Sequence, residues 1–303
     1  MAKSMECEAS TIALVRQNTR VPVPEVYAFE SDGNCSVKAP FMLMECLDGN
    51  VGMDLGMEVP PERQQDFFKG LAEIHVELST IQLPMIGTIQ GINEHGIIQQ
   101  GPIPGLGGPF ATATEFFQTW CAKATFGLSD DRLHHSCGPY AAELVPSIKS
   151  FPTKLSMVAS CLSKFDKGPF PLIHGDFGHN NVVVNDDYQI IGVIDWEKAF
   201  AAPWEIAGDF PLTLSTVPPA MDAPWNYDEV GKPKDPVLAK RFASQKDYIA
   251  NIKDAEDARS ITELPRLLNL LQDSCKQRLM TAMMRLYPSG KVGFYSNLVL
   301  EGS

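Results

Sequence analysis

The chain has 303 residues, enough for one large domain or two lobes with a sizeable core. Its composition, 44% hydrophobic and 20% charged, is that of an ordinary globular protein. The net charge of −12 argues against nucleic-acid binding, because phosphate backbones are held by clustered Lys and Arg. The seven cysteines are scattered, the N-terminus has no apolar signal segment, and no run reaches the ~18 apolar residues of a membrane span. We therefore expect reduced thiols and a cytoplasmic protein that does not enter a membrane.

The N-terminal part predicts a helix, an extended segment and a strand, in that order. Residues 6–18 combine helix formers with the apolar residues Ile12, Leu14 and Val15. Residues 19–26 contain two prolines, which favour an extended backbone. Residues 39–47 form an apolar run of strand length, and the turn sequence Asp-Gly-Asn follows it.

The middle of the chain predicts mainly helices. Residues 60–80 open with Pro-Pro-Glu and place apolar side chains at helical spacing, which is typical of an amphipathic helix. Residues 112–126 and 153–165 are further candidates for helices. The Gly- and Pro-rich residues 100–109 predict a loop.

Residues 170–202 form the most informative segment of the chain. A short apolar strand is followed by a polar turn and by two more strands, residues 181–184 and 189–194, joined through Asn-Asp-Asp. His174, Asp176, Asn181 and Asp195 stand at the ends of these apolar runs. Because strand ends and loops on a rigid scaffold are where catalytic groups usually lie, we expect these four side chains to be presented together.

The last third predicts one loop and two long helices. Residues 211–236 are rich in proline and predict an ordered loop, whereas residues 235–257 and 261–287 predict the helices. The methionine and tyrosine side chains near the end of the second helix have helical spacing and are expected in the core. Glu205 and Asp209 either hold an amine or hydroxyl of a substrate or are surface charges.

The polar residues of the central segment suit phosphoryl transfer. That reaction needs oxygen ligands for a hard cation and one carboxylate beside the attacking hydroxyl. A loop with Asp176 and Asn181 supplies the carboxylate and one ligand, and Asp195 at a neighbouring strand end supplies the second ligand.

The same residues carry a resemblance. The central segment is similar to the catalytic segment of the aminoglycoside phosphotransferase-like branch of the protein-kinase-like fold, particularly its fungal members. The similarity lies at residues 174–176 (HGD), Asn181 and residues 194–197 (IDWE). The resemblance implies that Asp176 accepts the proton of the substrate hydroxyl and that Asn181 and Asp195 hold Mg²⁺ on the phosphates of ATP or GTP. It also places His174 in the catalytic segment, where such a histidine braces the loop.

The resemblance extends to the N-terminal part. It implies that Glu8, with Glu6 as the alternative, matches the helix glutamate that pairs with the phosphate-binding lysine. It also implies that the backbone at Glu45, Cys46 and Leu47 forms the hinge that binds the nucleotide base.

One departure from the family pattern concerns the phosphate-binding elements. In the family, a Gly-rich loop and a lysine-bearing strand precede the helix, and only seven residues precede Glu8 here. Lys3 falls on the same predicted helix, so we do not assign it the nucleotide role. Three alternatives stay open: a catalytically weakened enzyme, a pseudokinase-like binding protein without catalysis, and a start site upstream of Met1.

We therefore predict an α+β, protein-kinase-like two-lobe fold, with a truncated small lobe and hinge over residues 1–50 and a mainly helical large lobe over residues 51–303. The expected function is ATP-dependent transfer of a phosphoryl group to a hydroxyl of a small molecule. Two other interpretations remain. His174, Asp176 and His179 form H-x-D-x-x-H, a pattern that also suits zinc or iron in a hydrolase. Asp176 and Asn181 could also be ordinary turn residues.

Overall fold

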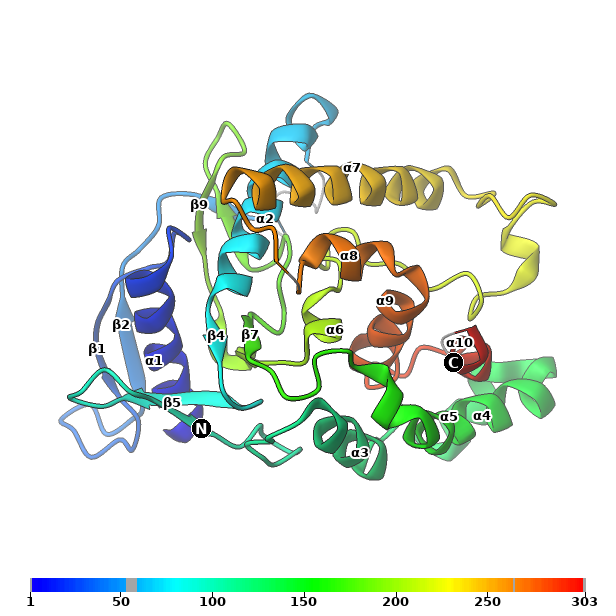
Figure 1. Ribbon diagram of the computed structural model, residues 1–303, viewed down its shortest axis with the longest axis horizontal. Coiled ribbons are helices and arrows are strands. Elements are labelled where there is room, and N and C mark those ends of the chain that lie inside the picture. Colours follow the sequence, from blue (N-terminus) through cyan, green and yellow to red (C-terminus); the bar gives the residue numbers. More distant parts are fainter. Residues whose placement is uncertain (1, 53–58, 264, 302–303) are drawn as a thin grey trace.

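The computed structural model describes residues 2–52, 59–263 and 265–301. They form the predicted α+β two-lobe fold (Figure 1). The smaller lobe, at the left of Figure 1, contains helix α1 (Ala2–Asn18) and the antiparallel strands β1 (Val26–Glu30) and β2 (Phe41–Met44). The predicted N-terminal helix and the strand after it are therefore confirmed.

Helix α1 is held by a hairpin that the sequence analysis did not predict. Its apolar residues Ile12, Leu14 and Val15 are buried, and the helix packs against β5 (Thr88–Ile92). Strand β5 pairs with β6 (Ile98–Gly101), so the predicted loop over residues 100–109 begins two residues too early. These strands are short and partly polar, which explains why their alternation gave no signal.

Two small antiparallel sheets carry the central segment. In one, β7 (Phe170–Ile173) lies between β4 (Gln82–Leu83) and β10 (Phe200–Ala201). In the other, β8 (Val182–Val184) lies between β3 (Asn50–Val51) and β9 (Ile190–Val193). The predicted turn between β8 and β9 is confirmed, since Asn185 Oδ1 accepts from the backbone N–H groups of Asp187 and Gln189, each at 3.0 Å. Both sheets therefore end at the polar residues of the segment.

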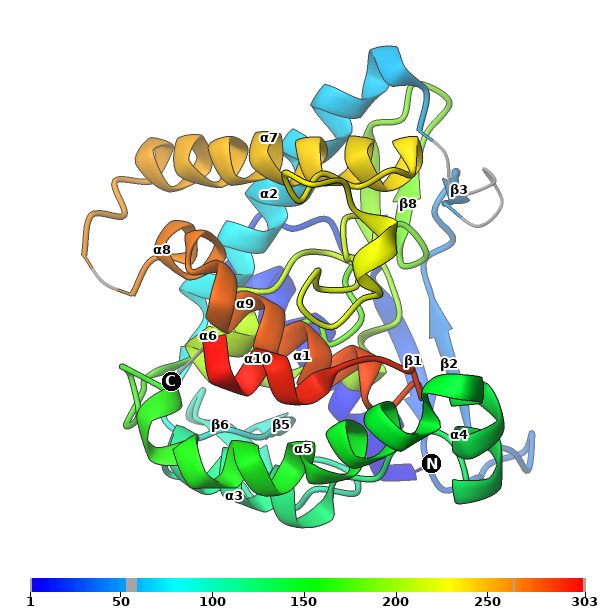
Figure 2. The ribbon, with the colours of Figure 1, turned by 90° about the vertical axis from the view of Figure 1, so that its right-hand side faces the viewer.

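The larger lobe is built around α2 (Pro61–Thr80), which confirms the predicted amphipathic helix. Pro61 is its first residue, where the missing N–H has no partner to lose. Its apolar face packs on β7 and on the long α7 (Pro236–Ala258), which crosses it in Figures 1 and 2. The other helices of this lobe are α3 (Ala113–Lys123), α4 (Asp130–Cys137), α5 (Ala141–Leu162), α6 (Trp204–Ala207), α8 (Leu267–Gln272), α9 (Ser274–Thr281) and α10 (Tyr295–Glu301), with short 3₁₀ turns at Gly138–Tyr140, Trp196–Lys198 and Pro224–Asn226.

Two helix predictions need correction. Helix α5 begins at Ala141, not near residue 153, and continues through Pro146 and Pro152 because a long apolar face, from Leu144 to Leu162, is buried along it. The single helix predicted over residues 261–287 is wrong. The chain breaks at Asp273, whose carboxylate accepts from Lys276 N and starts α9, and a π-helical turn at Ala282–Leu286 follows.

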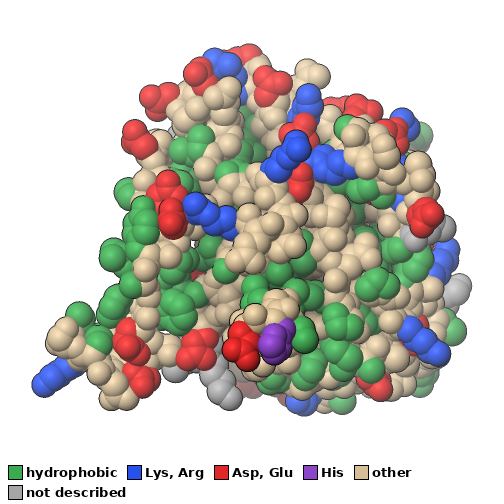
Figure 3. Space-filling model, turned by 60° about the vertical axis from the view of Figure 1, so that its left-hand side comes forward, with side chains coloured by type: hydrophobic (Ala, Val, Ile, Leu, Met, Phe, Trp, Pro, Cys, Tyr) green, Lys and Arg blue, Asp and Glu red, His purple; other side chains and the backbone are tan. Residues whose placement is uncertain are grey.

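On the face shown in Figure 3, Lys and Arg side chains lie among Asp and Glu side chains, with hydrophobic side chains between them. In the part of the chain that the structure describes, no helix is long and apolar enough to cross a membrane.

One buried histidine makes the fold sensitive to acid. His75 of α2 lies 2.7 Å from Ala207 O through Nε2 and 2.9 Å from the Tyr248 hydroxyl through Nδ1. The carbonyl can only accept, so Nε2 carries the hydrogen and Nδ1 accepts from the hydroxyl. Burial lowers the pKa of His75 to about 4.

We expect the protein to lose stability as the pH falls from 6.5 towards 4. The unfolded chain binds a proton at His75 near pH 6.5 and the folded chain does so only near pH 4, so the stabilisation is complete above pH 6.5 and is lost on acidification. This difference is worth about 3 kcal/mol. Urea unfolding of wild type and His75→Gln at several pH values measures it. The variant should show a shallower slope, and His95→Gln, at an exposed histidine, should keep the wild-type slope.

Candidate functional site

The turn that presents Asp176 is closely packed. Gly175 follows His174 at the end of β7 and has φ of +81°, a conformation that favours glycine. A Cβ atom at this position would lie 2.1 Å from the carbonyl oxygen of Lys198. The backbone at Gly175 therefore lies in close contact with the backbone at Lys198, because β10 pairs with β7 (Phe200 opposite Ile173).

His174 braces this turn. Its Nε2 lies 2.8 Å from Ile194 O, and its Nδ1 accepts from the backbone N–H of Asp176 at 3.3 Å. The ring is buried and its centroid lies 4.5 Å from that of Trp196. Burial lowers the pKa of His174, so the ring is neutral at pH 7 with its hydrogen on Nε2. One ring therefore joins the residue before Asp195 to the backbone of Asp176.

Asn181 connects the same two places. Its side-chain Nδ2 donates to the backbone oxygen of Asp176 at 2.8 Å, and its backbone carbonyl oxygen accepts from Ile194 N at 3.0 Å. Its Oδ1 accepts no hydrogen bond from any described residue. The side chain is thus oriented through its amide nitrogen, and the oxygen remains available as a ligand.

Asp195 lies two residues after the end of β9 and has a left-handed backbone, with φ of +64°. Such a conformation is uncommon outside glycine and occurs often at functional sites. Within the described residues its exposed carboxylate makes no hydrogen bond or ion pair. A pair of oxygen donors from Asn181 and Asp195 suits a hard cation such as Mg²⁺.

Lys198 is a residue that the sequence analysis missed. Its Nζ lies 3.0 Å from Asp176 Oδ2. The hydrogen bond and charge of Asp176 raise the pKa of Lys198, and the carboxylates of Asp195 and Glu197 add to the rise. Its position three residues after Asp195 was the only signal in the sequence, and the contact itself depends on the pairing of β10 with β7.

Glu8 of α1 reaches this site from the small lobe. Its Oε1 accepts from the backbone N–H of Trp196 at 3.2 Å. Burial raises the pKa of Glu8, the Trp196 N–H opposes the rise, and the charges of Asp195 and Glu197 add to it. Glu8 has no ion pair with a lysine or arginine among residues 2–52, 59–263 and 265–301. The alternative, Glu6, accepts from the Ser31 hydroxyl and lies elsewhere on α1.

The predicted hinge lies against the sheet that carries Asn181. Glu45 N donates to Glu25 O at 2.8 Å. The backbone N–H and C=O of the next residue, Cys46, have no hydrogen-bond partner in the described part of the chain. Leu47 packs on β9, where a Cβ atom on Gly192 would lie 2.1 Å from Leu47 Cδ1. Free backbone groups beside an apolar side chain are suited to a planar base.

The sequence comparison decides the family. The model of the phosphotransferase enzyme family (APH) matches residues 2–205, which is more than half of the chain and includes every residue of this site. The chain belongs to the phosphotransferase enzyme family. No curated protein matches this phosphotransferase sequence.

Several solved structures have a similar fold. Aminoglycoside phosphotransferase APH(4)-Ia is 16% identical, with a TM-score of 0.49, and the match covers 100% of this chain and 84% of that one. A thermostable mutant of APH(4)-Ia in a ternary complex with ADP and hygromycin B has the same identity and TM-score, with 98% and 83% covered. A GDP complex of an aminoglycoside 2'-phosphotransferase-IIIa mutant is 14% identical, with a TM-score of 0.43 and 94% and 74% covered. At these identities and TM-scores, no property of these proteins is carried over to this chain.

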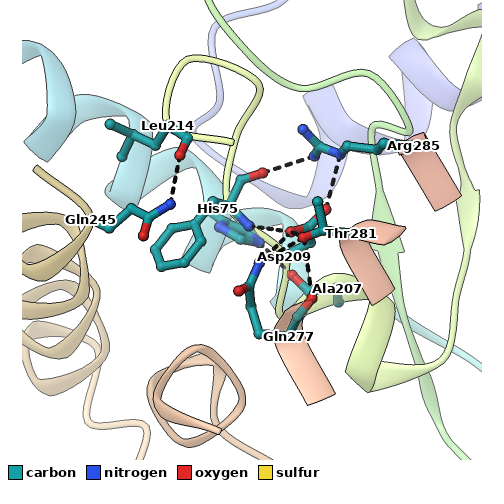
Figure 4. A network of polar contacts seen from close by, with 9 residues as sticks. His75, Ala207, Asp209, Leu214, Gln245, Gln277, Thr281 and Arg285 are labelled. Atoms are coloured by element: carbon teal, nitrogen blue, oxygen red, sulfur yellow. Dashed lines mark hydrogen bonds and ion pairs between the residues drawn. The ribbon is translucent and has the colours of Figure 1, made fainter. Parts of the chain in front are cut away.

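Two further candidate residues lie in the core of this phosphotransferase, away from the surface. Glu205 is 3% exposed and accepts from Lys164 N at 3.1 Å. Asp209 is 8% exposed and pairs with Arg285 at 2.9 Å, as Figure 4 shows. Burial and internal partners indicate structural roles for both, so neither is a surface charge.

The H-x-D-x-x-H pattern does not form a transition-metal cluster. His174 uses its ring nitrogens on Ile194 and Asp176, and His179 Nδ1 lies 3.2 Å from the Thr213 hydroxyl. In the described ranges, no three His, Cys, Asp or Glu residues gather in a way that could hold a metal ion. The geometry therefore offers the hydrolase interpretation no support.

Proposed function

We propose that this phosphotransferase moves the terminal phosphoryl group of ATP or GTP to a hydroxyl of a small molecule, in the cytoplasm. The observation that carries the proposal is the double hydrogen bond of Asn181, to Asp176 O at 2.8 Å and from Ile194 N at 3.0 Å. It joins the proposed base to both proposed metal ligands in one unit. Such positioning is most of what phosphoryl transfer asks of a protein.

In the proposed reaction, Asp176 orients the acceptor and takes the hydroxyl proton while the acceptor oxygen bonds to phosphorus. The bond from phosphorus to the bridging oxygen breaks, and the nucleoside diphosphate leaves. Asn181 Oδ1 and the Asp195 carboxylate would hold magnesium, which would supply positive charge to offset the phosphates. Lys198 fixes the Asp176 carboxylate, and neutral His174 holds the backbone behind it.

For the nucleotide, we propose that the base binds the free backbone groups of Cys46, beside Glu45 and on the apolar side chain of Leu47. The lobe boundary then lies near residue 50, where β3 begins. Glu8 belongs to this lobe and contacts Trp196, the residue after Asp195, so its partly buried charge would face the proposed metal site.

The first test is thermal unfolding with and without MgATP. Ligand at about 100 times its dissociation constant adds roughly 2.7 kcal/mol of stability, which is a shift of a few degrees for a domain of this size. We expect the shift in wild type and its loss in Asp195→Asn. Asp130→Asn, at an exposed surface pair with Lys149, is the control and should keep the shift. An equal shift in Asp195→Asn would remove Asp195 from the metal site.

A second candidate function is nucleotide binding without catalysis. The observation that favours it is Glu8, which has no cationic partner among the described residues. Formation of ADP from MgATP by the full chain distinguishes the two. A thermal shift with ADP formation supports the transferase, and a shift without any turnover supports the binding protein.

Lys198 gives a sharper test of the transferase. We expect Lys198→Ala to lower kcat about 10²-fold, the cost of losing one preorganised charged group, with little change in the KM for ATP. Lys198→Arg should recover part of the rate because it keeps the cation beside Asp176. Lys149→Ala, in a surface pair of similar length, is the control. A loss that arginine does not relieve, with a raised KM, would point to packing.

A further inference from the structure

A pocket lies in the helical lobe, apart from the catalytic segment. It has a volume of about 820 Å³ and lies between α7, the α8 and α9 helices, and the loop before α7. Its lining comes only from residues 210–278, so no residue of the segment 170–202 touches it. Figure 1 shows α7, α8 and α9 on the side of the molecule away from α1. The pocket therefore shares no residue with the catalytic segment.

One wall of this pocket is cationic. Lys246 of α7, Arg278 of α9 and Lys232 of the loop line it, and Asp247 is its one acidic lining residue. None of the three cations makes a side-chain hydrogen bond or ion pair with a described residue. Arg278 is half-buried and carries five N–H donors, so it is the most costly of the three to leave without a partner.

Two cations near the end of α7 have carboxylate partners, whereas Lys240 of α7, like Lys246, has no ion pair with a described residue. On the same helix, Lys253 pairs with Asp257 at 2.8 Å. Arg266 pairs with Glu256 at 2.8 Å and with Asp257 at 3.1 Å. In a chain of net charge −12, the pocket lining carries three cations and one carboxylate. This local excess of positive charge is what an anionic ligand requires.

Much of the remaining lining is apolar. Ala239, Phe242 and Ala243 lie on the same face of α7 as Lys246, at helical spacing. Phe210 and Leu271 close the pocket from the other side. A cavity of this size with an apolar lining and a few polar groups is typical of a site for a small organic molecule.

We propose that this pocket binds an organic anion, a molecule with one acidic group on an apolar body. Arg278 and Lys246 hold the carboxylate, sulfonate or phosphate group, and the apolar body lies against Phe242 and Phe210. Gln277 lines the pocket and donates to Asp209 at 2.7 Å, so the ligand also contacts the buried network of Figure 4.

The test is a fluorescence titration of the full chain with anilinonaphthalene sulfonate, and with phenylnaphthylamine as its uncharged analogue. Wild type should bind the sulfonate at a saturable site and the uncharged analogue more weakly. Arg278→Gln combined with Lys246→Gln should weaken sulfonate binding by about tenfold or more, and should leave the uncharged analogue unchanged. Lys253→Gln, whose pair with Asp257 lies outside the pocket, should bind as wild type.

The single variant Lys246→Gln, at an exposed position, keeps the test valid if the double variant fails to fold. It should weaken the sulfonate alone. Sulfonate binding that is unchanged in Lys246→Gln, equal binding of the two probes by wild type, or no saturable binding would each overturn the proposal. A shift with MgATP is measured separately, so failure here leaves the proposed function untouched.

Discussion

Asp176→Asn should lower kcat by about 10²–10⁴-fold and leave nucleotide affinity unchanged. The amide has nearly the same shape but cannot accept the hydroxyl proton. The neighbouring Asn181 contacts the backbone of residue 176, not its side chain, so the proposed metal ligands should stay in place. ADP formation measures the first effect, with water as the acceptor until a hydroxyl substrate is found, and the thermal shift with MgATP measures the second.

The control for this experiment is Asp187→Asn, at an exposed pair with Arg63 on the turn between β8 and β9. It should change neither quantity. If Asp176→Asn abolished the MgATP shift as fully as turnover, Asp176 would be a ligand of the nucleotide complex and our assignment of the base would be wrong.

Asp209→Ala should have the largest effect on stability. Asp209 receives hydrogen bonds from Gln277 and Thr281, each at 2.7 Å, and pairs with Arg285 at 2.9 Å (Figure 4). Its removal leaves a partly buried guanidinium without its charge partner, which costs about 3–5 kcal/mol. At roughly 2–4 °C per kcal/mol, the melting temperature should fall by about 6–20 °C.

Asp130→Ala provides the comparison for Asp209→Ala. Its pair with Lys149 is 2.9 Å long but exposed, so its loss should cost at most about 1 kcal/mol. Equal costs for the two variants would mean that the network around Asp209 is solvated and contributes little. Replacement of both Asp209 and Arg285 by Leu and Met should recover part of the loss, because no unpaired charge then remains.

The sequence was sufficient where local patterns determine structure. The turn at Asn185, the amphipathic helix from Pro61 and the order of Asp176, Asn181 and Asp195 depend on short-range chemistry, and the fold and the family are confirmed. The roles of these residues, and the hinge at Cys46, stay predictions.

The sequence was insufficient where contacts between distant segments, a capping side chain or the burial of a helix face determine the structure. The contact of Lys198 with Asp176 depends on β10 returning beside β7. The break at Asp273 divides a stretch with continuous helical spacing, because the capping carboxylate restarts the chain in a new direction. Helix α5 continues through two prolines because the burial of its apolar face outweighs their cost.

The pairing of β3 with β8 has a mechanical consequence. Asn50 lies opposite Val184, so the strand that leaves the hinge is hydrogen-bonded into the sheet that bears Asn181. The connection between the lobes is therefore fixed beside Asn181 and Asp195, the proposed metal ligands, and rotation of one lobe about it would break backbone hydrogen bonds. On the proposed function, the distance from the proposed hinge to these ligands is set when the chain folds, so nucleotide binding would cost little affinity for ordering the protein.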